Sequence, residues 1–303
     1  MKKNKLLLLV FVVLLSANAI AQPFADIVSF NYQTFSAMYK DSVRSKNHTD
    51  NYAFSLFFPK EFKNGNMLLV RINSELLNST IMPDTSYSRQ LASVSVPLGF
   101  QFVSKSKKWK TVTIVIPKLA SDFRDNAMNS NNYQLGGIFL ENYLPNDKLK
   151  IKAGLYYNRE AFGNFFMPLV GLDWKINKRI SLYGVLPTNY KVEFNLLKNR
   201  LYSGVCFKSL TRSFRLSKGN NYDYVRYDEE QLKVFVDYFV VPKLLLFAEA
   251  GYTLGKSPIQ YMYNTNEKVY YNPVYTPTQS YPIFNVGIAF RIRQDLEKSE
   301  EIK

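Results

Sequence analysis

Apolar and polar residues alternate along three consecutive runs between residues 170 and 197. Apolar side chains occupy every second position of each run, and charged or polar side chains occupy most of the positions between them. In the first run, for example, Trp174 and Ile176 flank Lys175. Successive side chains of a strand point to opposite faces, so each run predicts a strand with one apolar and one charged face.

The same alternation recurs along most of the chain and predicts fourteen strands. The clearest segments are 92–102, 149–158, 170–176, 179–186, 190–197, 231–240, 244–253 and 284–292. Weaker matches cover 27–39, 50–58, 66–73, 109–116, 133–143 and 200–210. Twelve strands is the alternative, because the first three segments alternate least regularly.

Long two-faced strands in an even number are typical of an all-β fold, the transmembrane antiparallel β-barrel with both termini in the periplasm. Such barrels have short periplasmic turns, as predicted at 177–178 and 198–199, and longer external loops, as predicted at 211–230 and 255–282. A soluble β-sandwich also alternates. However, its strands are usually shorter than the runs of nine to eleven residues that repeat here.

The amino terminus predicts export. A lysine-rich start precedes an apolar run from Leu6 to Leu15, and the small-residue pattern Ala19-Ile20-Ala21 follows. This predicts a signal peptide over 1–21, cleaved between Ala21 and Gln22. A barrel over 22–292 and a charged periplasmic tail over 293–303 follow it. No later run reaches the roughly 18 apolar residues of a membrane helix, so the predicted location is the cell outer membrane, spanned by strands.

The chain is strongly basic, with a formal charge of +15 that includes three signal-peptide lysines and leaves +12 on the mature protein. Export excludes nucleic acid as a partner, so the predicted counter-charges are outer-membrane lipid and lipopolysaccharide phosphates. Cys206 is the single cysteine, so no internal disulfide can form. Neither a metal site nor a cofactor is predicted, because Cys and His do not cluster. The sequence does not specify an oligomeric state.

The charged strand faces are predicted to line the lumen, because Lys or Arg at the bilayer midplane costs about 2–4 kcal/mol. The candidate lumen-lining residues are Lys150, Lys152, Asp173, Lys175, Arg179, Lys191, Glu193, Lys233, Asp237, Glu249 and Arg291. With Arg71 and Lys208 included, nine basic groups face four acidic ones. This excess favours anions in an open pore. A lumen filled by mutual ion pairs is an equally good interpretation.

Tyrosine and proline interleave in the segment 255–282. The candidate binding residues there are Tyr261, Tyr263, Tyr270, Tyr271 and Tyr275, because a tyrosine ring can stack on a sugar or pack on a partner protein. A loop that folds into the barrel mouth is the competing interpretation. The segment 211–230 begins basic and ends acidic, which predicts a solvated loop or one that contacts lipopolysaccharide phosphates.

His48 is the only histidine of the chain, and it lies beside Asp50 with Ser42 and Ser45 nearby. These residue types could form a serine hydrolase site. A lone histidine in a polar loop is more typical of an ordinary surface residue. We therefore predict no catalytic residues and no enzyme.

Three segments of the chain are similar to a known group of proteins, namely PLVGLDWKINKRISLYGVLP, VFVDYFVVPKLLLFAEAGYTLG and PIFNVGIAFRI. In them the chain resembles Bacteroidota outer-membrane β-barrel proteins of unknown function. The resemblance implies insertion by the outer-membrane assembly machinery, which reads a last strand ending in an aromatic residue, here Phe290. The likeness concerns architecture and implies no activity.

Two functions follow from these patterns. The first is a pore or channel for small solutes, anions among them. The alternative is a non-conducting surface barrel that binds glycan, lipid or protein partners through its Tyr-rich external loops.

Overall fold

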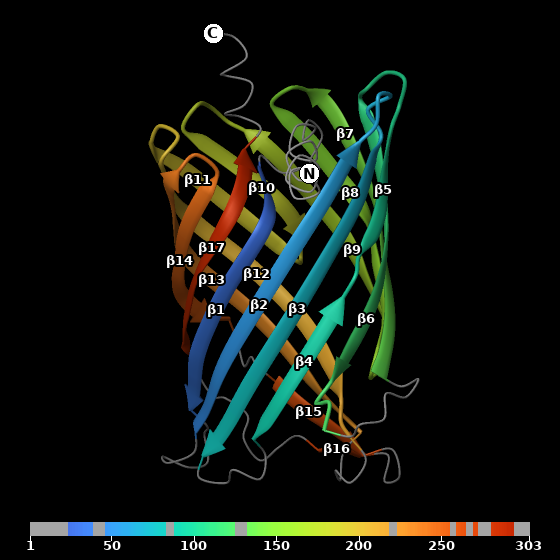
Figure 1. The fold of residues 1–303 in the computed structure, drawn as a ribbon, viewed down its shortest axis with the longest axis vertical. Coiled ribbons are helices and arrows are strands. Elements are labelled where there is room, and N and C mark those ends of the chain that lie inside the picture. The colour runs from blue at the N-terminus through green and yellow to red at the C-terminus, as the bar shows by residue number, and fades with distance from the viewer. Residues whose placement is uncertain are drawn as a thin grey trace, which may run out of the picture.

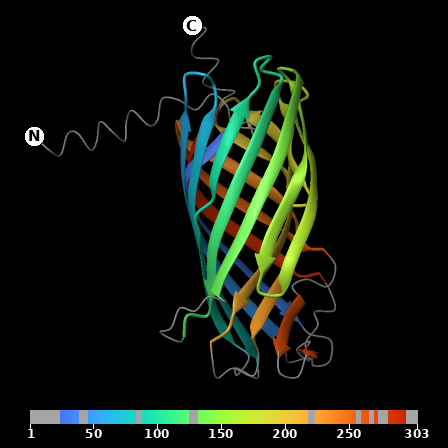
Figure 2. The same cartoon turned by 90° about the vertical axis from the view of Figure 1, so that its right-hand side faces the viewer.

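The computed structural model shows one closed antiparallel barrel of fourteen strands, which confirms the predicted fold and strand number. The strands tilt strongly against the barrel axis, so near and far walls cross in projection (Figures 1 and 2). The structure describes residues 24–38, 46–82, 88–124, 132–217, 223–254, 259–264, 269–271 and 280–293. Within these ranges no helix is long and apolar enough to cross a membrane.

The strand segments follow one another along the chain. They are β1 (Phe24–Met38), β2 (Lys46–Glu61), β3 (Met67–Met82), β4 (Arg89–Ser95), β5 (Leu98–Val103), β6 (Trp109–Ser121), β7 (Tyr133–Asn146), β8 (Leu149–Glu160), β9 (Gly163–Lys175), β10 (Ile180–Leu186), β11 (Asn189–Leu197), β12 (Leu201–Arg215), β13 (Tyr224–Val241), β14 (Leu244–Thr253), β15 (Ile259–Asn264), β16 (Val269–Tyr271) and β17 (Pro282–Arg293).

Each barrel strand pairs with its neighbour in sequence, and β17 closes the ring by pairing with both β14 and β1. Segments β4 and β5 together form one strand of the barrel. The strand is interrupted between them because Pro97 has no N–H to donate to the ladder. Hydrogen bonds from the Arg71 N–H to the Pro97 carbonyl (2.9 Å) and from the Val96 N–H to the Pro117 carbonyl (3.0 Å) bridge the break. β15 and β16 form a small hairpin that is not part of the fourteen-strand barrel. β15 pairs with residues 224–228 of β13, beyond the part of β13 that pairs with β14.

The two faces of the barrel wall differ chemically. Large apolar side chains remain exposed at alternating positions of the outer face, such as Phe166 (70%) and Val170 (63%). Charged side chains such as Lys152, Lys233 and Glu193 are buried on the inner face. An exposed apolar belt around a polar interior suits a barrel that has lipid on its outside.

The connections also differ between the two ends. At one end, which we call the short-turn end, the connections are 62–66, 104–108, 147–148, 176–179, 198–200 and 242–243. Asn199 (φ 64°) and Lys243 (φ 73°) adopt left-handed conformations in two of these turns. β1 begins and β17 ends at this end (Figure 1). The opposite end, which we call the long-connection end, has the two longest connections, 122–132 and 254–281, together with the two-residue turns 161–162 and 187–188.

The prediction of a loop over 211–230 is wrong. β12 and β13 continue as a regular antiparallel ladder from the pair Ser209 and Glu230 to the pair Arg215 and Tyr224. The alternation is lost from the sequence here because this part of the hairpin contacts protein, so neither face has to be apolar for lipid. We call residues 210–215 and 224–229 the hairpin tip.

The hairpin tip lies across the barrel interior near the long-connection end. Arg215 pairs in parallel with Ser121 of β6, and the Asp122 N–H donates to the Arg215 carbonyl (3.1 Å). β6 and β12 lie on opposite sides of the ring in strand order. The tip shares a buried apolar cluster with the far wall, formed by Leu77, Leu91, Ala120, Phe214, Leu216, Val225 and Tyr227.

Candidate functional site

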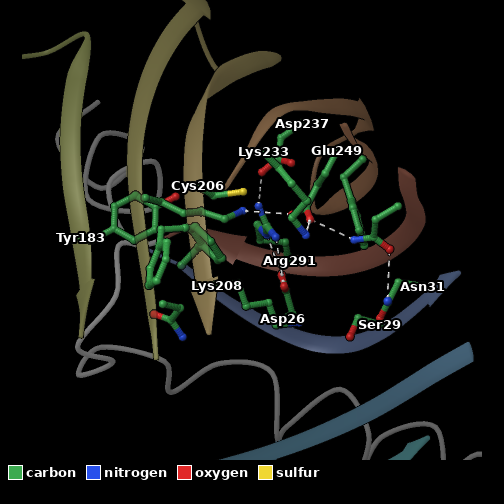
Figure 3. A pocket seen from close by; sticks show the side chains of 16 residues that line it. Asp26, Ser29, Asn31, Tyr183, Cys206, Lys208, Lys233, Asp237, Glu249 and Arg291 are labelled. Carbon is green, nitrogen blue, oxygen red and sulfur yellow. Dashed lines mark hydrogen bonds and ion pairs between the residues drawn. The ribbon is translucent and has the colours of Figure 1, made fainter. Parts of the chain in front are cut away.

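A polar cavity of about 260 Å³ lies inside the barrel, and we call it the chamber (Figure 3). Side chains from β1, β10, β11, β12, β13, β14 and β17 line it. Its charged lining residues are Asp26, Lys191, Lys208, Lys233, Asp237, Glu249 and Arg291. Four of these are cationic and three are carboxylates, so the lining carries one excess positive charge.

Three lysines surround Cys206 on the chamber wall. Lys191 of β11 and Lys233 of β13 are the strand partners of Cys206 on its two sides, and Lys208 is two residues further along β12. Glu249 of β14 is paired with both neighbours: it contacts Lys233 Nζ directly and lies 3.8 Å from Lys191 Nζ. One carboxylate thus serves two of the three ammonium groups.

Lys208 is the third ammonium group of this cluster, and it differs from the other two. Its side chain is exposed within the barrel, where it lines the chamber. Among the described residues, none forms an ion pair with it. An unpaired cation beside a polar cavity attracts a small anion, because the low-dielectric wall screens its charge less than bulk water does.

An arginine layer bounds the chamber towards the short-turn end. Arg291 donates to Asp26 (Nε to Oδ1, 2.6 Å) and to Asp237 (2.5 Å), and its guanidinium stacks 3.7 Å from the Phe24 ring centre. Arg293 donates to Glu193 across the interior (2.6 Å). These buried arginines are each matched by carboxylates, so they contribute structure rather than free positive charge.

The hairpin tip bounds the interior towards the long-connection end. Arg212 of the tip is buried and contacts two carboxylates at once, Glu75 of β3 and Glu229 of β13. Ser213 adds polar contacts to two further strands of the wall. It accepts from the Gln134 amide of β7 at its carbonyl (3.0 Å), and its hydroxyl donates to Glu160 of β8 (2.5 Å).

The predicted lumen-lining residues fall into four groups. Lys191, Lys233, Asp237, Glu249 and Arg291 line the chamber. Lys150 and Lys152 share Asp173 in a cluster between β8 and β9, with Lys150 Nζ 3.6 Å from the carboxylate. Glu193 binds Arg293. Lys175 ends β9 and Arg179 lies in the following turn, and both are exposed.

Sequence reasoning missed several charged residues of the interior. These are Asp26, Glu75, Arg212, Glu229 and Arg293. Asp26 and Arg293 lie just beyond the predicted strand ends, and Glu75 continues the alternation of Arg71 and Asn73 past the predicted end at residue 73. Extending each strand while its alternation persisted would have found Glu75. Arg212 and Glu229 lie in the segment 211–230, where the sequence predicts a loop and therefore no inner face.

Of the Tyr-rich segment, the structure describes only part. Tyr261 and Tyr263 lie in β15, and Tyr270 and Tyr271 lie in β16, so these four are carried by a hairpin rather than by an irregular loop. β15 pairs with the hairpin tip, where Tyr263 faces Tyr224 in register. Tyr275 lies outside the described residues.

His48 lies within β2 and not in a loop. Its Nδ1 is 2.9 Å from the Ser36 hydroxyl of β1, and its Nε2 is 3.2 Å from Asp50 Oδ2. Ser42 and Ser45, which the sequence placed near it, lie outside the described residues. The structure therefore brings together Ser36, His48 and Asp50 on the outer face of two neighbouring strands.

No family model matches this chain, and no curated protein matches it. Several solved structures are similar to it in fold. An outer-membrane channel from Pseudomonas putida F1 has 11% sequence identity and a TM-score of 0.49, with 91% of this chain and 97% of that one covered. A deletion mutant of the monoaromatic hydrocarbon channel TodX has 11% identity and a TM-score of 0.48, with 88% and 89% covered. The translocator domain of the autotransporter NalP from Neisseria meningitidis has 10% identity and a TM-score of 0.39, with 95% and 94% covered.

Proposed function

We propose that this protein is an outer-membrane channel for small anionic solutes, and that the structure described here is its closed state. The observation that carries the proposal is the chamber, a polar cavity inside a lipid-facing barrel with the unpaired Lys208 on its wall. The short-turn end is then periplasmic, and the long-connection end faces the outside. The predicted contacts with lipopolysaccharide and with the assembly machinery stay predictions.

Anion preference is supported by how the charges are paired. Arg212, Arg291 and Arg293 are each paired with carboxylates, so the count of nine basic against four acidic groups overstates the free charge. Arg71 is the exception, because it stacks on the Phe57 ring (4.4 Å) and forms no ion pair with a described residue. The lysine cluster is different, because Lys191 and Lys233 share the single carboxylate of Glu249 and Lys208 forms no ion pair with any described residue. The preference for anions therefore depends on the few cations that have no carboxylate of their own, Lys208 of the chamber among them, and not on the whole lumen.

The closed state is supported by the hairpin tip. Its residues are buried against the far wall, including Phe214, Ser213 and Tyr227, each with essentially no exposed surface. A solute that passes from outside to the chamber has to displace this tip. Conduction thus requires a second arrangement of the β12–β13 hairpin, in which Arg212 no longer contacts Glu75 of β3; its contact with Glu229 lies within the hairpin tip.

Reversal potentials in planar bilayers under a KCl gradient test the proposal. The folded wild-type barrel is expected to open in steps that favour chloride. Lys208→Gln removes a charge that has no carboxylate partner, so it is expected to lower the chloride-to-potassium permeability ratio by about twofold without weakening the barrel.

Lys118→Gln is the matched control, because Lys118 also projects from the wall but lies near the hairpin tip, 5.9 Å from the Phe214 ring centre. It is expected to leave the ratio unchanged. Folded protein that shows no conductance steps under any applied voltage overturns the channel, and equal shifts in both variants overturn the role of Lys208.

A non-conducting surface barrel remains the second candidate, and the buried hairpin tip favours it. In that case β15 and β16 serve as a binding platform held by β13. Absence of conductance together with glycan or protein binding that is lost on deletion of residues 259–271 is the outcome expected of this alternative.

A further inference from the structure

Three side chains on the outer face of the barrel form a hydrogen-bonded chain that the channel does not use. Ser36 and His48 are direct partners in the β1–β2 ladder, and Asp50 is two residues from His48 on the same face of β2. The Ser36 hydroxyl lies 2.9 Å from His48 Nδ1, and His48 Nε2 lies 3.2 Å from Asp50. We propose that these residues are a catalytic site that hydrolyses acyl esters of lipids at the outer membrane surface.

The partners determine the direction of the hydrogen bonds. An ionised carboxylate only accepts, so the imidazole nitrogen that faces Asp50, Nε2, must carry a proton. In a neutral imidazole the other nitrogen, Nδ1, is then an acceptor, and Ser36 donates to it. This is the arrangement that a serine nucleophile needs: the base is aligned with the hydroxyl proton, and a carboxylate fixes the tautomer of the base.

Asp50 is itself held in place by the barrel wall. The Tyr32 hydroxyl donates to its other oxygen, Oδ1 (2.6 Å), and the Tyr32 ring lies against Tyr52 with 5.1 Å between ring centres. Asp50 and Tyr32 are positioning residues, because they act through His48. Ser36 and His48 are the groups that touch the substrate.

The location of the site indicates a lipid substrate. Ser36 is four residues beyond Tyr32, which is about 13 Å along the strand towards the long-connection end. Between Ser36 and the short-turn end, the outer face carries exposed aromatic rings, among them Phe30 (44%), Phe54 (38%) and Phe284 (55%). Phe284 is the β17 partner of Thr34. An acyl chain that lies against these rings has its ester group near the level of Ser36, where the side chains of Ser36 and His48 are exposed.

The reaction balances with water as the only co-reactant. Ser36 Oγ bonds to the ester carbonyl carbon as its proton passes to His48 Nδ1, and the bond to the alcohol breaks as that proton passes to the leaving oxygen. Water then attacks the acyl-serine and gives a proton to His48. The Ser36 ester bond breaks, the proton returns to Oγ, and the fatty acid is released.

The test uses the full-length barrel, folded in liposomes of phosphatidylglycerol and phosphatidylethanolamine that carry a fluorescent acyl chain. Wild-type protein is expected to release labelled fatty acid and to react with a fluorophosphonate at Ser36. Ser36→Ala is expected to abolish both signals, and His48→Ala is expected to lower fatty-acid release at least about 100-fold. Asp50→Asn lowers release, and Asp50→Glu restores part of it, which a purely structural role would not require.

Ser74→Ala is the matched control. Ser74 of β3 also lies on the outer face of the barrel, but its strand partners are Phe54 and Val94, away from His48. It is expected to keep the full rate and full labelling. Heat-modifiable gel migration reports folding of every variant. Folded wild-type protein that neither labels at Ser36 nor releases more fatty acid than Ser36→Ala overturns the proposal, and it does so whether or not the barrel conducts.

Discussion

The two halves of the barrel interior share strands β12 and β13 but are packed in opposite ways. Near the long-connection end, the hairpin tip contributes buried apolar side chains, and Arg212 is matched by two carboxylates. In the chamber, Lys191 and Lys233 share Glu249, and Lys208 stays exposed beside a cavity. A closed interior needs apolar contact and matched charge, whereas a site for a solute needs space and unmatched charge.

The difference shows that charged residues in a lumen do not all have one role. Arg212 and Arg291 are held by carboxylates on two sides, and such groups fix one arrangement of the wall because a lost partner leaves a buried charge uncompensated. Lys208 loses no partner when it is replaced. Substitutions in the hairpin tip should therefore change whether the channel is open, and substitutions in the chamber should change what passes.

The largest effect is expected from locking the hairpin tip to the wall. In a Cys206→Ser background, Ser121→Cys with Arg215→Cys places two thiols at paired positions of β6 and β12, close enough for a disulfide. Oxidation is expected to abolish conductance steps, and a reductant is expected to restore them. Cys206→Ser alone should be insensitive to both reagents, and steps that persist in the oxidised double variant would show that the tip does not close the pore.

A smaller effect is expected from Arg212→Ala. Loss of a buried arginine that holds two carboxylates costs about 3 kcal/mol or more. If this cost falls on the closed state alone, the ratio of open to closed channels rises about 100-fold. Single-channel recording measures this as open probability. Arg226→Ala is the control, because Arg226 forms a partly exposed pair with Asp228 (2.8 Å), worth about 1 kcal/mol or less, and stacks on the Phe162 ring (4.1 Å) but holds no second carboxylate. Equal effects in the two variants would contradict the role of Arg212.

The smallest effect is expected from salt, and it should appear in the chamber alone. Raising ionic strength from about 0.1 to 1 M shortens the screening length from about 10 to 3 Å, so the preference for anions should fall. The buried contacts of Arg212 are screened much less, so open probability should change little. Reversal potentials and open times from one recording series separate the two quantities, and an anion preference that is independent of salt would argue against the lysine cluster.

Much of the fold could be predicted because the barrel wall is a local pattern. Each strand has to present apolar side chains to lipid and polar ones to the interior, and this requirement repeats every second residue, as at Trp174 and Lys175. The pattern failed where the requirement ends. Beyond Ser209 the β12–β13 hairpin contacts protein on the far wall, so its residues no longer alternate and periodicity predicts a loop where the chain forms strands.

The candidate sites could be predicted less well, because they depend on which strands meet. Lys191 and Lys233 were expected in the lumen, but their sharing of Glu249 requires the register of four strands. The sequence offers His48 as a candidate hydrolase residue, but with Ser42 and Ser45 as its neighbouring serines. Ser36 is twelve residues away from His48 and reaches it only through the β1–β2 ladder.

The sequence by itself determined the wall of this protein: its strands, their number, and the face that each turns to lipid. These follow from side-chain polarity at neighbouring positions, which the chain carries locally. Only the tertiary structure decided what lies inside and on the wall, namely the hairpin tip across the interior, the matched arginines, the unpaired Lys208 and the contact of Ser36 with His48. Those depend on register and on contacts across the barrel, and hydrophobic periodicity along one strand contains no information about either.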